Sequence, residues 1–82
     1  MLSFSKSLDV PGKGIYTFRF ARVYTVNGTK YFVMVHDRYG MAYQFSMQQT
    51  KEAWRLVDAA KLPIWIVSLE ATLENAILEQ LS

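Results

Sequence analysis

The residues of this chain that could do acid–base chemistry are few. His36 is the only histidine, and Asp37 follows it directly. A histidine can act as a general base near neutral pH when a carboxylate orients its ring. Neighbours in a strand point to opposite faces of a sheet, however, so Asp37 cannot orient His36 if both lie in a strand. An enzyme with His36 as general base is therefore the least favoured function, and the sequence favours a protein that is not an enzyme.

Two further motifs resemble parts of catalytic or phosphate-binding sites. Gly12-Lys13-Gly14 lacks the full G-x-x-x-x-G-K-[ST] spacing and the helix that follows a phosphate loop, so a basic turn is favoured. Glu70 and Glu74 stand four residues apart, and we expect them on the solvated side of the last helix. One histidine and no cysteine cannot form a zinc site of ordinary type. Neither a metal nor a cofactor is predicted.

Basic residues are concentrated in the first part of the chain. Residues 1–50 contain six Lys and Arg against two Asp, whereas residues 51–82 contain three against five Asp and Glu. The formal net charge is +2. An uneven distribution favours an anionic partner for the basic part. An excess of this size is also found on ordinary solubilising surfaces, so it does not identify the partner alone.

The composition is typical of one small globular domain over residues 1–82. Of the 82 residues, 51% are hydrophobic and 15% aromatic. A chain of this length buries roughly 60% of its unfolded surface, so its core is thin. The absence of cysteine excludes a disulfide scaffold. No apolar run approaches ~18 residues and the first residues lack signal-peptide order, so we expect a cytoplasmic protein with no membrane span.

Two turn signals predict the register of an antiparallel sheet. Asn27-Gly28 is typical of a two-residue type I′ turn, which places Phe20 opposite Val35. Asp37-Arg38-Tyr39-Gly40 is typical of a type I turn with a bulge, which places Tyr43 beside Val35. Both registers put the same alternate positions on one face of the sheet.

These signals predict an α+β fold in the order β-β-β-α-β-α, with an antiparallel sheet of three to five strands packed on one face by a helix. Thr50 is expected to cap a helix whose apolar side contains Trp54, Leu56 and Val57. The continuous apolar run that follows Pro63 is typical of a covered strand. The predicted elements are a lead-in or edge strand in 1–14, a β-meander over 15–48, a helix over 50–62, a strand over 64–68 and a helix over 70–81.

The two faces of the predicted meander differ in chemistry. One face is expected to form the core with Tyr16, Phe18, Phe20, Tyr24, Tyr31, Val33, Val35, Met41, Tyr43, Phe45 and Met47. Arg22 falls on this face, so either its head reaches the sheet margin or a bulge changes the parity. The second face carries Thr17, Arg19, Ala21, Val23, Thr25, Lys30, Phe32, Met34, His36, Arg38, Ala42, Gln44, Ser46 and Gln48.

The second face is where we expect a partner to bind. The candidate nucleic-acid- or partner-binding residues are Arg19, Arg22, Lys30, Phe32, Met34, His36, Arg38 and Tyr39. Basic residues around an exposed aromatic ring are typical of single-stranded nucleic-acid binding. An apolar stripe such as Val23, Phe32 and Met34 is more often covered by a helix or a second subunit. The sequence predicts a small, self-associating accessory or regulatory binding module, a homodimer or a complex with a protein partner, and single-stranded nucleic-acid binding is the alternative.

Overall fold

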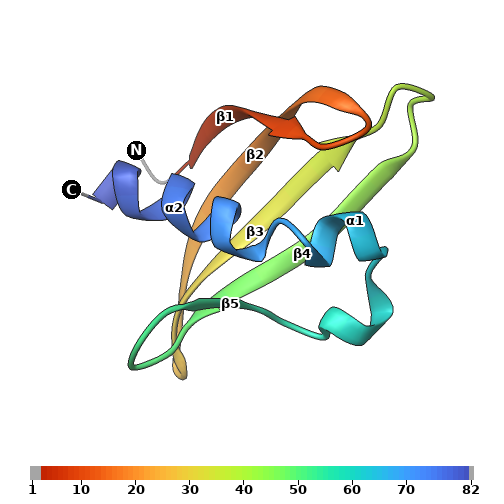
Figure 1. Cartoon of the computed structure of the whole chain (residues 1–82). Helices are drawn as coiled ribbons and strands as arrows, with labels where there is room; N and C mark the ends of the chain where they lie inside the picture. Colours follow the sequence, from red (N-terminus) through yellow and green to blue (C-terminus); the bar gives the residue numbers. More distant parts are fainter. Residues whose placement is uncertain (1–2, 82) are drawn as a thin grey trace.

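The computed structural model describes residues 3–81, which form one antiparallel sheet followed by short helices (Figure 1). The strands are β1 (Ser3–Val10), β2 (Gly14–Thr25), β3 (Gly28–His36), β4 (Ala42–Gln49) and β5 (Trp54–Leu56). Each strand pairs with its neighbours in chain order. A 3₁₀ helix (Ala59–Lys61), α1 (Ile64–Val67) and α2 (Glu70–Leu81) follow the sheet. The α+β class is confirmed.

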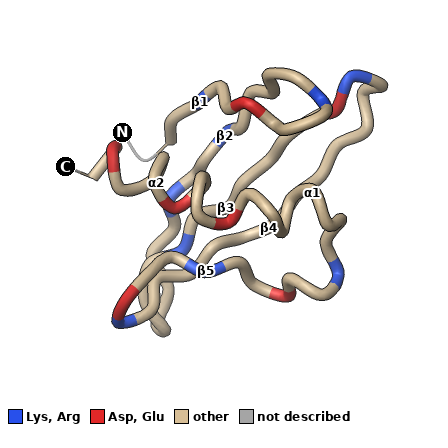
Figure 2. Tube along the Cα trace, in the orientation of Figure 1, with Lys and Arg blue, Asp and Glu red and all other residues tan. Residues whose placement is uncertain are grey.

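Helix α2 provides hydrogen-bond acceptors for two backbone N–H groups of the edge strand β5. The backbone N–H groups of Trp54 and Leu56 donate to the carboxylates of Glu74 and Glu70, each over 2.8 Å. Residues two apart in a strand and four apart in a helix have similar spacing, so the two carboxylates match the two donors. Figure 2 shows the acidic positions along α2. The expectation that Glu70 and Glu74 are only solvated is therefore wrong.

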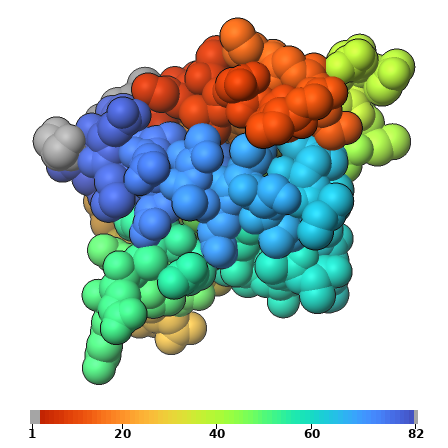
Figure 3. Space-filling model, in the orientation of Figure 1, coloured from red at the N-terminus to blue at the C-terminus, as the bar shows by residue number. Residues whose placement is uncertain are grey.

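The core lies between the sheet and the C-terminal helices. In Figure 3, α1 and α2 form a band across this face, between the N-terminal strands and the β4–β5 region. Phe18, Met47, Leu73 and Ile77 are fully buried there. Trp65 of α1 packs edge-on against two tyrosine rings of the sheet, with ring centres 5.7 Å and 5.3 Å away. One face of the sheet is thus sealed by apolar side chains.

The order of elements after residue 49 differs from the prediction. The residues predicted as a helix over 50–62 contain β5 and the 3₁₀ helix instead. Thr50 does not cap a helix, because β5 follows it instead; its hydroxyl oxygen still accepts the N–H of Ala53 over 3.1 Å, as an N-cap would, in the turn that leads into β5. Trp54 and Leu56 are buried and Arg55 between them is exposed, which is strand alternation.

The predicted strand over 64–68 is the helix α1. Pro63 directly precedes it, and proline is tolerated at the start of a helix because it has no N–H to satisfy. The Ser68 hydroxyl donates to the carbonyl of Ile64 over 2.8 Å at the other end. The helix over 70–81 coincides with α2, so the observed order is five strands and then helices.

The register between β2 and β3 is shifted by two residues from the prediction. Phe20 lies opposite Val33 rather than Val35, and the turn is at Val26-Asn27. Asn27 does not have positive φ, whereas Gly28 has φ +116°. A type I′ turn requires positive φ at both central residues, so this turn is of another type. A shift of two residues leaves every side chain on its predicted face.

We expect Gly28→Ala to lower the free energy of unfolding by about 1–2 kcal/mol, because an L-residue is strained at positive φ. A Cβ at Gly28 meets nothing within 4 Å, so the cost comes from the backbone alone. Denaturant unfolding should show a lower midpoint with an unchanged m value. Asn27→Ala is the matched control and should change stability by less than about 0.5 kcal/mol. Equal losses in both variants would contradict the observed turn.

Candidate functional site

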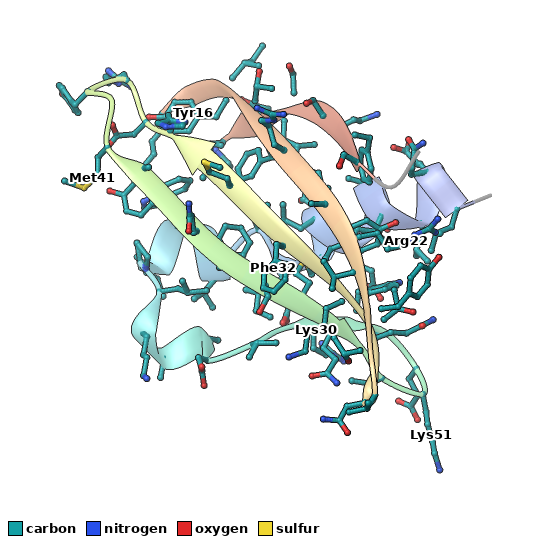
Figure 4. All side chains as sticks on the ribbon, turned by 180° about the vertical axis from the view of Figure 1, so that it is seen from behind. Tyr16, Arg22, Lys30, Phe32, Met41 and Lys51 are labelled. Atoms are coloured by element: carbon teal, nitrogen blue, oxygen red, sulfur yellow. The ribbon has the colours of Figure 1, made fainter. Side chains whose placement is uncertain are left out.

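No element of residues 3–81 covers the second face of the sheet. Figure 4 views the molecule from this side, with the sheet in front of the helices and with Lys30 and Phe32 labelled on β3. We call this surface the open face. The strand registers assign to it Ser3, Ser5, Ser7, Asp9, Ile15, Thr17, Arg19, Ala21, Val23, Thr25, Lys30, Phe32, Met34, His36, Ala42, Gln44, Ser46, Gln48 and Arg55.

Phe32 stands near the middle of the open face among small side chains. Ala21 of β2 and Ser46 of β4 lie directly opposite it, and Ser3 of β1 lies opposite Ala21. None of these three side chains is large enough to cover an aromatic ring, and Phe32 is 52% exposed. The same row of residues borders a hollow of about 530 Å³, which Met34 and Gln44 also line. The open face therefore has an unshielded ring beside a depression.

Two basic residues lie on either side of Phe32 along the strand direction. Lys30 precedes Phe32 by two residues on β3. Arg19 lies opposite Met34, which follows Phe32 by two residues. Arg19 is exposed, Lys30 is half-buried, and Arg19 also lines the hollow. A ligand that crosses the ring along β3 would thus meet a cation before and after it.

The open face has little negative charge. Among its residues, the only carboxylate is that of Asp9, opposite Ile15 at one end of the sheet. Arg55 belongs to the open face by register, but its guanidinium reaches Glu70 on α2, with 3.5 Å between nitrogen and oxygen. The surroundings of Phe32 are therefore polar and basic.

Family models, curated proteins and solved structures give no match for this chain. None of the described helices has the length and apolar character needed to cross a bilayer. Within residues 3–81, no three His, Asp or Glu side chains gather closely enough to hold a metal ion.

The structure places five of the predicted site residues together on the open face. These are Arg19, Lys30, Phe32, Met34 and His36. Arg19 and Met34 face each other across β2 and β3, and the Gln44 amide nitrogen lies 3.9 Å from the Met34 sulfur. His36 is exposed near the end of β3, opposite Ala42. Arg19, Phe32 and Met34 border the hollow, whereas Lys30 and His36 lie outside it.

Arg22 is not on the open face. The β2–β3 ladder is continuous from Phe20 to Val23, so no bulge changes the parity. The guanidinium carbon of Arg22 lies 5.5 Å from the centre of the Tyr24 ring, on the covered side of the sheet. Its Nε is buried and has no hydrogen-bond partner among the described residues. Arg22 is therefore not a member of the site around Phe32.

Arg38 and Tyr39 lie in the β3–β4 turn, beyond the end of the open face. The Asp37 carboxylate accepts the N–H groups of Tyr39 and Met41 over 2.9 Å and orders this turn. Arg38 donates to the carbonyl of Lys13 over 2.7 Å, which ties the turn to the β1–β2 connection. Tyr39 is 85% exposed. Neither Arg38 nor Tyr39 lines the hollow beside Phe32.

Sequence reasoning missed the contribution of β1 to the site. Ser3 borders the hollow, and the basic turn at Gly12-Lys13-Gly14, which connects β1 to β2, is the signal that could have placed Ser3 on the second face. Gln44 and Ser46 belong to the predicted second face, but they are not among the predicted site residues. The signal that could have identified them is the small size of Ala21 and Ser46 on the strands that flank Phe32.

Proposed function

We propose that this protein is a non-enzymatic binding module that holds single-stranded nucleic acid against the open face of its sheet. The observation that supports this most is the exposed ring of Phe32, 52% accessible, between Arg19 and Lys30. Single-stranded nucleic acids bind by stacking bases on aromatic side chains while Lys and Arg neutralise phosphates. Phe32 supplies the stacking surface, and the two basic residues supply the charge.

Charge favours a polyanion over a second copy of the chain as the occupant of this face. In a two-fold dimer that forms through the open face, both subunits contribute the same surface patch to the interface. The Arg19 and Lys30 side chains of both copies would then lie within one interface, with Asp9 of each copy as the only carboxylate on its open face. Like charges brought together at an interface are unfavourable. A nucleic-acid strand carries negatively charged phosphates, so this repulsion does not arise when it occupies the open face.

The proposal is tested with a single-stranded oligonucleotide of about 12 nucleotides, titrated across a series of salt concentrations. Binding is expected, and its affinity should fall as salt increases, because phosphate contacts release counterions. A duplex of the same sequence should bind more weakly, because its stacked bases cannot reach Phe32. No binding at low salt, or equal affinity at every salt concentration, would overturn the proposal.

Phe32→Ala is expected to weaken oligonucleotide binding about 5- to 150-fold, which corresponds to the loss of one stacked base. Tyr39→Ala is the matched control, because it removes an exposed ring outside the hollow, and it should leave affinity unchanged. Fluorescence anisotropy with a labelled strand measures both variants. Unchanged affinity in Phe32→Ala would contradict the proposal. So would a dimer in the parent protein that Phe32→Ala converts to a monomer, because Phe32 would then be an interface residue.

A further inference from the structure

We infer that the open face takes a short segment of single strand, with one base stacked on Phe32 and one phosphate held on each side of it by Lys30 and Arg19. This inference rests on the proposed function and specifies the length and contacts of the ligand. It follows from three features of the open face: the spacing of the two cations, the number of exposed rings and the shape of the hollow.

The spacing of the two cations limits the length of strand that contacts the protein. Lys30 lies on β3, two residues before Phe32. Arg19 lies on the adjacent strand β2, opposite Met34, which is two residues after Phe32. With about 3.4 Å per residue along a strand and about 4.8 Å between strands, the Cα atoms of Lys30 and Arg19 are about 14 Å apart. A stacked strand carries one phosphate per about 3.4 Å, so this distance spans about four nucleotides, and fewer if the strand is extended.

The number of rings limits the stack to one base. Phe32 is the only Phe, Tyr or Trp among the strand residues assigned to the open face, and the His36 ring lies four residues further along β3, outside the hollow. The exposed rings of Tyr24 and Tyr39 lie on the covered side and in a turn, away from the Phe32 row. The base next to the one stacked on Phe32 would therefore meet Met34 or polar side chains before it reached the His36 ring.

The hollow gives the stacked base a place and polar neighbours. Its volume of about 530 Å³ lies beside the Phe32 ring because Ala21 and Ser46 leave the flanking positions open. Ser46 and Gln44 of β4 line it on one side, and Ser3 of β1 also lines it. Hydroxyl and amide groups both donate and accept hydrogen bonds, so each of these residues can contact the edge of a base.

Oligothymidylates and oligouridylates of increasing length test the short footprint. Affinity should increase with strand length up to about five nucleotides. For longer strands it should increase only in proportion to the number of positions on the strand at which the protein can bind. The logarithm of affinity should fall against the logarithm of salt with a slope of about −1.4, because each phosphate contact on a single strand contributes about −0.7. Comparison of the two series identifies whether DNA or RNA is preferred, since only RNA offers the 2′-hydroxyl.

Variants that each remove one positive charge test whether Arg19 and Lys30 contact the two phosphates. Arg19→Gln and Lys30→Gln should each reduce the steepness of the salt dependence by about 0.7. Lys51→Gln is the matched control, because Lys51 lies in the β4–β5 loop and loses the same charge outside the open face (Figure 4). Its slope should equal that of the parent protein. Denaturant unfolding of each variant establishes that the fold is retained.

Three outcomes separate the inference from the proposed function. Affinity that keeps rising steeply to about 12 nucleotides overturns the short footprint but leaves nucleic-acid binding in place. A slope that neither Arg19→Gln nor Lys30→Gln changes overturns the assignment of the two phosphates in the same way. Absence of binding at every length overturns the proposed function itself.

Discussion

Replacing both Glu70 and Glu74 by alanine is expected to lower the free energy of unfolding by about 3–6 kcal/mol. Each carboxylate accepts a backbone N–H of β5 over 2.8 Å, and a hydrogen bond to a charged group contributes about 1.5–3 kcal/mol. The two N–H groups are partly buried, so their loss of partners adds a desolvation cost. Each single variant should show about half of the effect in denaturant unfolding.

Arg55→Ala separates the backbone contacts from the ion pair on the same helix. Glu70 also pairs with Arg55 over 3.5 Å, and the Arg55 side chain is 61% exposed. An exposed pair of this kind contributes about 0–1 kcal/mol, so Arg55→Ala should be much milder than Glu70→Ala. Equal effects would assign the stabilisation to the ion pair. The double variant Glu70→Ala/Glu74→Ala should also associate more strongly in gel filtration. It leaves the backbone N–H groups of Trp54 and Leu56 without partners on the outer edge of β5, where another strand can pair.

The faces of the meander were predictable because the pattern of residues 15–48 repeats every two positions. Phe18, Phe20 and Val33 are buried as their alternation predicts. The turn at Gly28 was misplaced, since a glycine at positive φ fits more than one turn type and sequence does not distinguish them. The error was two residues, and a strand repeats its side-chain direction at that interval, so most of the core was still identified. Tyr24 and Met41 were predicted in the core but are 64% and 60% exposed, because Tyr24 lies at the end of β2 and Met41 directly before β4, both beyond the helices.

The elements between residues 50 and 67 were not predictable from local pattern. Trp54, Leu56 and Val57 fit one side of a helix, but two apolar residues two apart also fit a strand. Contacts from the distant Glu70 and Glu74 stabilise the strand. The continuous apolar run after Pro63 favours a strand locally, yet it forms α1, where Trp65 packs against the sheet. Tertiary contacts override propensity in segments this short.

The candidate site could be predicted only in part. Alternation placed Arg19, Lys30 and Phe32 on one face, because side-chain direction depends on parity alone. Arg38 was assigned to that face by extending the strand beyond its end, where the Asp37 turn begins. The hollow depends on which residues lie opposite Phe32 on three neighbouring strands. That information requires the register of β1, and the predicted basic turn at Gly12-Lys13-Gly14 does not fix this register until its length and type are known.

Phe18→Ala is expected to lower the free energy of unfolding by about 3–5 kcal/mol, because its ring is fully buried and its loss leaves a cavity. Phe32→Ala removes the same side chain from the open face and should cost about 1 kcal/mol or less. Denaturant unfolding of the two variants measures both values under one condition.

The contrast between these two phenylalanines bears directly on function. An exposed ring that contributes little to stability does not owe its place on the open face to the fold, whereas Phe18 does. A loss above about 2 kcal/mol in Phe32→Ala would show that the ring acts as a core residue, and the stacking role would then lose its support. A small loss together with weakened oligonucleotide binding assigns the Phe32 ring to the ligand rather than to the core.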